Sequence, residues 1–157
     1  LRAEIDNLNS FIYPSINNGV YRAGFAGTQE AYDEAVVSLF NSLDQLEERL
    51  ASKRYLTGDT ITEADWRLFT TLIRFDPVYF GHFKCNISRL IDYPNLWGYL
   101  KDLYQVPGIA ETVDIDHIKA HYYASHTHID PTAVIPKGPK LDYSTAHGRE
   151  NTGNLAV

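Results

Sequence analysis

The first third of the chain carries apolar residues at helical spacing. From Leu1 to Ile16 they recur every three or four positions, which predicts an amphipathic helix with one buried face. Pro14 lacks an amide donor and is expected to kink this helix. The run Asn17-Asn18-Gly19 is typical of a helix end. Residues 20–27 contain two glycines and show no clear period, so the sequence predicts a loop or a broken turn there.

Two strong helix starts follow. Thr28 precedes a long apolar stripe that ends at Lys53 and Arg54, which predicts a capped helix of about seven turns. The second start is a capping box in which Thr62 and Asp65 exchange hydrogen bonds, with Ile61 packing on Trp66 as a hydrophobic staple.

The helix that begins at the capping box runs from Trp66 to about Phe75 and is apolar on nearly every side, so we expect it at the centre of a bundle. Asp76-Pro77 is expected to end or bend it. Pro94 suits the first turn of a helix that continues to about Gln105, and Asp114 can cap a last short helix.

Beyond Ser125 the chain becomes rich in Pro, Gly, His and Thr, which indicates an extended or partly disordered arm. No alternating strand of useful length occurs. The sequence therefore predicts an all-α bundle of about six helices over residues 1–138, followed by an irregular C-terminal tail over residues 139–157.

Composition narrows the classes of function. The chain of 157 residues has 14 Lys and Arg against 20 Asp and Glu, and its scattered cations argue against nucleic acid as a partner. No apolar run approaches the roughly 20 residues of a membrane span, and no signal peptide is visible, so no membrane partner is expected. The single cysteine, Cys85, precludes an internal disulfide and suits a reducing compartment such as the cytoplasm.

The sequence contains no methionine, and its first residues already follow a helical pattern. We therefore expect further folded chain before Leu1.

Four segments carry a resemblance to a known family. The segment 55–66, Tyr-Leu-Thr-Gly-Asp-Thr-Ile-Thr-Glu-Ala-Asp-Trp, resembles the start of the central buried helix in the C-terminal domain of glutathione transferases. Segments 17–26, 74–86 and 117–126 are together similar to the Xi class, the glutathionyl-hydroquinone reductases. The resemblance covers residues 1 to about 138.

This resemblance implies an enzyme whose N-terminal thioredoxin-like domain holds the co-substrate glutathione and carries a nucleophilic cysteine in a Cys-Pro-Trp-Ala type motif. That motif is absent from the chain. Such enzymes remove glutathione from S-glutathionyl-hydroquinones, giving hydroquinone and glutathione disulfide. The chain would then be the substrate-binding helical half, inactive alone, with no catalytic residue of its own and with a homodimer as the expected assembly.

Four tyrosines are the candidates for binding the hydroquinone. Tyr21 lies in the glycine-flanked segment, where a phenol can project into a cleft, and Tyr79, Tyr122 and Tyr123 can converge on the same place. The resemblance places tyrosine hydroxyls around the hydroquinone ring at the segments of Tyr21 and of the His-Tyr-Tyr run, and we prefer Tyr122 to Tyr123. Core packing is the competing interpretation, because eleven tyrosines in one small domain cannot all be functional.

Other candidate groups have simpler interpretations. Cys85 is expected to act as a small buried hydrophobe, and Asp65 as a helix cap. The four histidines of the region after Asp114 have partial ligand spacing but no evident third ligand in fixed geometry, so no metal site is predicted; they are His117, His121, His126 and His128.

Two alternatives to an enzyme half stay open. A transferase-like helical domain can serve as a non-catalytic interaction module, which a closed tyrosine segment and an apolar patch elsewhere would favour. A small metal-binding bundle is the other. If a partner domain is missing, its docking surface should leave apolar side chains exposed near residues 1–25 or along the central helix.

Overall fold

The computed structural model describes residues 1–153, and its longest element is α3, Gln29–Ser52. The Thr28 hydroxyl accepts a hydrogen bond from the Ala31 amide at 3.2 Å, so the predicted cap and helix are confirmed. One face of α3 is fully buried and forms the spine of the core. Its buried leucines are Leu39, Leu43, Leu46 and Leu50.

The N-terminal helix is interrupted at Pro14, where the sequence predicts a kink. Helix α1, Arg2–Ile12, leads directly into a π-helical turn, Tyr13–Asn17, closed by the Asn18 amide on the Tyr13 carbonyl at 2.9 Å. A π turn is wider than an α turn and gives the proline ring room. Pro14 therefore marks a local widening of the helical path.

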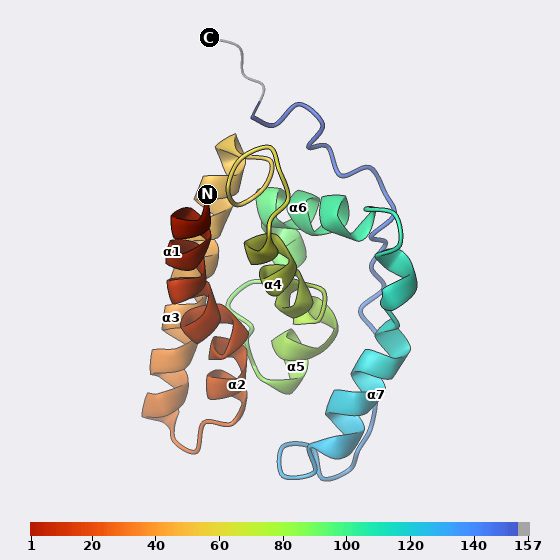
Figure 1. The fold of residues 1–157 in the computed structure, drawn as a ribbon. Helices are drawn as coiled ribbons and strands as arrows, with labels where there is room; N and C mark the ends of the chain where they lie inside the picture. Colours follow the sequence, from red (N-terminus) through yellow and green to blue (C-terminus); the bar gives the residue numbers. More distant parts are fainter. Residues whose placement is uncertain (154–157) are drawn as a thin grey trace.

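The loop or broken turn predicted at residues 20–27 is wrong for residues 20–24. After the π turn the chain forms α2, Gly19–Gly24, which packs along α3 (Figure 1). Val20 and Ala23 are buried against the core, and a Cβ on Gly24 would lie 2.2 Å from Phe83. Tertiary packing thus outweighs the low helix propensity of glycine, and the glycines serve close approach between elements. Tyr21 consequently lies on a helix and not in a loop.

The capping box at the start of α4, Glu63–Leu72, is confirmed. Asp65 is fully buried and its carboxylate accepts from the Thr62 amide at 2.7 Å and from the Leu56 amide at 2.9 Å. Ile61 and Trp66 are both half-buried. Trp66 packs edge-on against Phe69 with ring centroids 5.8 Å apart, and the staple to Ile61 stays a prediction.

The predicted helix ends before Asp76-Pro77, because α4 stops at Leu72. A second π-helical turn, Phe75–Tyr79, continues into the short helix α5, Phe80–His82. The Asp76 carboxylate accepts from the amide of Leu90 at 2.6 Å and so caps the 3-10 turn Leu90–Asp92. Burial raises the pKa of Asp76.

Helices α6, Pro94–Tyr104, and α7, Ile115–Ser125, complete the bundle (Figure 1). Between them lies a short 3-10 turn, Ala110–Thr112. Pro94 occupies the first turn of α6, as predicted, and the Asp114 carboxylate accepts from the His117 amide at 2.9 Å at the start of α7.

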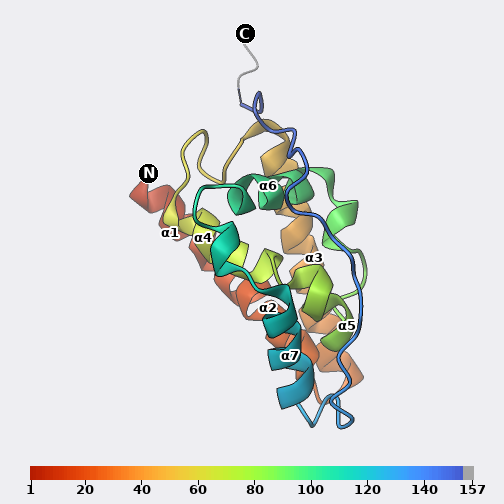
Figure 2. The ribbon, with the colours of Figure 1, turned by 90° about the vertical axis from the view of Figure 1, so that its right-hand side faces the viewer.

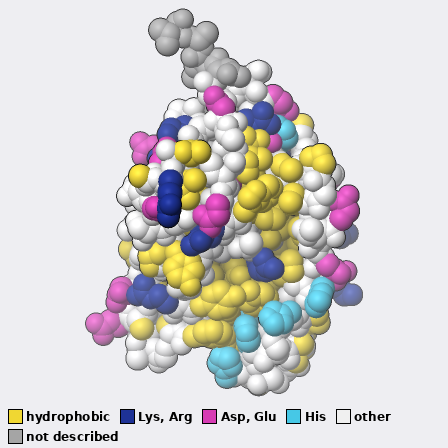
Figure 3. All heavy atoms as spheres, in the orientation of Figure 1, with side chains coloured by type: hydrophobic (Ala, Val, Ile, Leu, Met, Phe, Trp, Pro, Cys, Tyr) yellow, Lys and Arg dark blue, Asp and Glu magenta, His cyan; other side chains and the backbone are white. Residues whose placement is uncertain are grey.

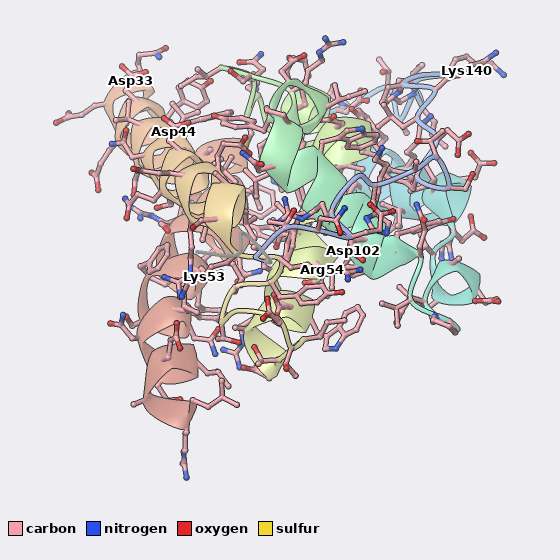
Figure 4. All side chains as sticks on the ribbon, turned by 90° about the horizontal axis from the view of Figure 1, so that it is seen from above. Asp33, Asp44, Lys53, Arg54, Asp102 and Lys140 are labelled. Carbon is pink, nitrogen blue, oxygen red and sulfur yellow. The ribbon has the colours of Figure 1, made fainter. Side chains whose placement is uncertain are left out.

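An ion pair fastens α6 to the segment after α3. The Arg54 guanidinium donates to both carboxylate oxygens of Asp102, at 2.8 and 3.0 Å (Figure 4). The Asp102 side chain is 5 % exposed, so this pair is shielded from water and fixes the position of α6.

The C-terminal arm is extended and lies on the bundle. From the end of α7 it runs back along that helix and then over α6 (Figure 2). Arg149 is 3 % exposed and donates to the carbonyls of Leu50, Lys53 and Arg54 at 2.9, 2.6 and 3.0 Å. A cation at the C-terminus of α3 satisfies carbonyls that have no partner within the helix. Residues 154–157 of the predicted tail lie outside the described residues.

The all-α fold class is confirmed. Over residues 1–153 the only β-type pairing is a single bridge between Tyr55 and Gly58. In the same range no helix combines the length and hydropathy needed to cross a membrane.

Candidate functional site

Three of the four candidate tyrosines meet at their hydroxyl groups. Tyr21 comes from α2, Tyr79 from the second π turn and Tyr122 from α7. The Tyr122 oxygen lies 2.5 Å from the Tyr21 oxygen and 2.8 Å from the Tyr79 oxygen. Residues up to 101 positions apart in sequence therefore form one hydrogen-bonded chain, which we call the phenol trio.

The phenol trio borders an open cleft of about 430 Å³. The volume suits a small aromatic molecule. Lining the cleft are Tyr13, Asn17, Asn18, Tyr21, Arg67, Thr70, Thr71, Arg74, Tyr79 and Tyr122. The tyrosine segment is therefore open to the cleft. A closed segment would have favoured the non-catalytic interaction module.

Burial keeps the Tyr79 and Tyr122 hydroxyls protonated. Tyr79 is 2 % exposed and Tyr122 is 6 % exposed, whereas Tyr21 is half-buried. Desolvation raises the pKa of Tyr79 far above its usual value of 10 and, with the hydrogen bond to Tyr21, raises the pKa of Tyr122 to about 12. Both groups consequently carry their protons near neutral pH and can donate them.

Aromatic packing holds the trio in place. The buried Phe83 ring stacks on Tyr79 with centroids 5.4 Å apart and meets Tyr122 edge-on at 5.9 Å. Its centroid is 5.2 Å from that of Tyr21. One phenylalanine thus contacts all three phenols and restricts their rotation.

Tyr123 does not reach the cleft. Its ring lies against His82, with centroids 4.6 Å apart, and its hydroxyl lies close to Gly81. Successive residues on a helix point about 100° apart, so Tyr122 and Tyr123 cannot both face the same cleft. The structure brings Tyr21, Tyr79 and Tyr122 together and leaves Tyr123 on another side of α7.

The polar side of the cleft was missed by the sequence interpretation. Arg67, Thr70, Thr71 and Arg74 follow one another at intervals of three, one and three residues, and all four line the cleft. These four polar residues recur at helical spacing. That spacing could have indicated a polar face on the helix that the sequence interpretation took as apolar on nearly every side. Arg67 is paired with Glu63 at 2.5 Å.

Cys85 is fully buried and its pKa is raised by desolvation to about 12. A thiol with a raised pKa is a poor nucleophile at neutral pH. Its sulfur lies 3.9 Å from the Val20 carbonyl oxygen, in agreement with the predicted packing role.

Histidine side chains gather at the lower edge of the face in Figure 3, near the end of α7. His82 is 4 % exposed, and its Nε2 lies 3.0 Å from Nδ1 of His126. Across the described residues, no three His, Cys, Asp or Glu side chains are arranged to hold a metal ion.

Apolar side chains also lie exposed where a docking surface was expected. Leu1, Tyr13 and Phe25 are 73 %, 51 % and 47 % exposed. Figure 3 shows further apolar surface across the face that carries α4 and α7. A groove there is lined mainly by Trp66, Phe69, Ile73, Ile109, Val113 and Ile118.

Comparison with known proteins gives a consistent picture. The family model for the glutathione S-transferase C-terminal domain matches residues 29–102. The chain is 59 % identical over 150 residues to the glutathionyl-hydroquinone reductase YqjG of Escherichia coli, covering 96 % of the chain and 46 % of that protein. It is 54 % identical over 138 residues to the glutathionyl-hydroquinone reductase PcpF of Sphingobium chlorophenolicum, covering 88 % and 44 %.

Solved structures agree. The glutathione-bound structure of the Escherichia coli protein superposes with a TM-score of 0.93, over 95 % of this chain and 48 % of that one. A Xi-class glutathione transferase from Natrialba magadii, 52 % identical, superposes with a TM-score of 0.93 over 95 % and 46 %. The chain spans about half the length of the relatives it matches.

Proposed function

Because the chain belongs to the Xi class of glutathione transferases, as their C-terminal helical domain, we propose that it forms the quinol-binding half of a glutathionyl-hydroquinone reductase. The names of its relatives support this activity, and the glutathione-bound relative supports glutathione as the co-substrate. The single observation that carries the proposal is the phenol trio at the cleft.

The trio has one hydroxyl proton to spare. Three phenols carry three hydroxyl protons, and the two hydrogen bonds among them use two. We assign Tyr79, the most deeply buried of the three, as the donor to Tyr122, and Tyr122 as the donor to Tyr21. The half-buried Tyr21 hydroxyl keeps its own proton for a ligand in the cleft.

That proton suits the oxygen of a hydroquinone. In the proposed reaction a hydroxyl proton of the ring first moves to the carbon that bears the sulfur, which gives the keto tautomer. A cysteine thiolate from another domain then attacks the glutathionyl sulfur, and the electron pair of the sulfur–carbon bond leaves an enolate whose negative charge lies on the quinol oxygen. The Tyr21 hydroxyl stabilises that charge, the oxygen takes a proton from water, and a second glutathione releases the mixed disulfide.

Tyr79 acts through Tyr122, and Tyr122 through Tyr21. A chain of hydrogen bonds polarises its members, so each donor upstream makes the Tyr21 proton a better donor. We therefore regard Tyr79 and Tyr122 as positioning residues for the Tyr21 hydroxyl. Tyr123 is left out of the proposed site because it lies away from the cleft.

The proposal includes partners that the chain does not contain. The relatives are about twice as long as the matched region, which supports an N-terminal thioredoxin-like domain that supplies glutathione and the nucleophile. We place the transferase-type domain at residues 1–138 and the tail at residues 139–157. The single buried Cys85 is compatible with a cytoplasmic location, and exposed apolar residues are available for the second domain and for a homodimer.

Turnover of an S-glutathionyl-hydroquinone tests this function. The full-length protein is expected to release hydroquinone and glutathione disulfide in equal amounts, and residues 1–157 alone are expected to release neither. A full-length protein without turnover, or activity in the isolated chain, would contradict the proposal.

A further inference from the structure

The cleft beside the phenol trio is cationic although the protein is acidic. The formal charge of the chain is −6, yet the residues that line the cleft include two arginines and no acid. A concave site lined by one sign of charge concentrates ligands of the opposite sign. The cleft is therefore suited to a ligand that carries negative charge.

The two arginines are not equivalent. Arg67 is exposed and paired with Glu63, so its charge is largely compensated. Arg74 is half-buried, and the hydrogen bond it makes runs from Nη1 to the Thr70 carbonyl at 2.6 Å. Among residues 1–153 no carboxylate lies within ion-pair distance of the Arg74 guanidinium, so its other donors are free for a ligand.

Arg74 also lines two neighbouring hollows, one of which is the apolar groove described above. A second hollow of about 300 Å³ is lined by Arg74 and Tyr122, which line the cleft as well, and by residues of the α7 start. Those further lining residues are Thr112, Asp114, His117, Ile118 and His121. If the ring of a ligand binds at the phenol trio, a substituent on that ring can extend past Arg74 into the second hollow.

The charges in the second hollow leave room for an anion. Asp114 is its one acidic lining residue, and that carboxylate accepts from the His117 amide as the cap of α7. His117 and His121 contribute ring N–H donors, and Arg74 contributes a permanent positive charge.

We propose that this site selects quinols that bear a carboxylate on the ring, with Arg74 as the residue that binds the carboxylate. The inference rests on the proposed function for the identity of the ring. A guanidinium binds a carboxylate through two parallel hydrogen bonds, which an ester cannot match with the same charge. Arg74 could instead bind a carboxylate of the glutathionyl group. The experiment below distinguishes a carboxylate on the ring from one on glutathione.

The test compares a quinol that bears a carboxylate with the uncharged methyl ester of the same quinol. Binding of 2,5-dihydroxybenzoate and of methyl 2,5-dihydroxybenzoate to the full-length protein is measured by calorimetry, without glutathione. The acid is expected to bind about tenfold more tightly than the ester. Equal binding of the two would overturn the inference, because Arg74 would then not meet a charge on the ring.

Three variants assign the preference. R74Q should abolish the preference for the acid while leaving the ester affinity within about twofold, and R74K should keep part of it through its charge. R67Q changes the other arginine of the cleft, which is already paired with Glu63, and should alter the ratio by less than twofold. Loss of affinity for both compounds in R74Q would overturn the assignment, because Arg74 would then maintain the structure of the cleft without distinguishing the charged ligand from the uncharged one.

Turnover separates this inference from the proposed function. With the glutathionyl derivatives of the two quinols, R74Q should lower kcat/KM about tenfold for the acid and little for the ester. An equal fall for both would place Arg74 on a glutathione carboxylate and overturn the inference. If neither derivative reacts but the acid still binds more tightly, the proposed function fails and the anion site stands.

Discussion

Two groups of tyrosines in this domain have opposite surroundings. Tyr99, on α6, is fully buried, and its hydroxyl donates to the Asp65 carboxylate at 2.8 Å. The trio of Tyr21, Tyr79 and Tyr122 bond to one another at the edge of an open cleft. A phenol that donates to a buried carboxylate has its proton committed, whereas a chain of phenols leaves one proton over.

The Tyr99 group is part of the fold. Asp65 accepts from the amides of Leu56 and Thr62 as well as from Tyr99, and none of these groups borders the cleft. The difference shows that the partner of a tyrosine hydroxyl, more than its burial, separates a structural phenol from one available to a ligand. Variants that break each group should therefore have separate effects.

The largest effect is expected from Asp65→Ala. The substitution leaves several buried donors without an acceptor and removes the cap of α4, which should lower the free energy of unfolding by about 4 kcal/mol. Urea unfolding measures it, with Asp59→Ala in the exposed loop before α4 as the control. A loss below about 1 kcal/mol would show that this network does not hold the fold.

The elements around Asp65 were predictable, and those around Tyr21 were not. The capping box is a local pattern of residues three apart, so the sequence alone indicated α4 and the role of Asp65. The helix at Tyr21 depends on contacts of Val20 and Gly24 with α3 and Phe83, which a local pattern cannot reveal. The resemblance to the Xi class indicated Tyr21 and Tyr122, but not their hydrogen bond or the free Arg74.

Acid should weaken the fold through His82, whose ring lies beside the trio residue Tyr122. Burial, followed by the charge of His126, lowers the pKa of His82 from 6.5 to about 4, with smaller effects of Lys84, His128 and the opposing Asp130. The unfolded chain therefore binds this proton more readily than the folded one. The stabilisation is complete above pH 6.5 and is lost as the pH falls towards 4, by at most about 3 kcal/mol.

Unfolding measured between pH 7 and pH 4 checks this, with His82→Gln as the comparison. The variant should lose less stability over that range than the parent chain. Parallel curves for the two proteins would show that His82 does not set the acid sensitivity.

A smaller effect is expected from Tyr99→Phe. The Asp65 carboxylate keeps its hydrogen bonds from Leu56 and Thr62, so the free energy of unfolding should fall by about 1 kcal/mol. The turnover number of the full-length protein should stay within twofold. A large loss of turnover at unchanged stability would erase the distinction between the two groups of tyrosines.

The smallest effect is expected from Tyr123→Phe. This residue is next to Tyr122 in sequence but lies against His82, away from the cleft. Both kcat and KM should change by less than twofold in the full-length protein. A fall in kcat comparable to that of a trio variant would mean that the cleft described above is not where the quinol binds.

The measurement that tests the central claim most directly is the turnover number of Tyr21→Phe in the full-length protein, taken with its unfolding curve. Phenylalanine keeps the ring packed on Phe83 and removes only the hydroxyl. If the Tyr21 proton stabilises charge on the quinol oxygen, kcat should fall about 10²-fold while stability changes by less than about 1 kcal/mol. A kcat within threefold of the parent, in a variant that unfolds at the same urea concentration, would contradict the account.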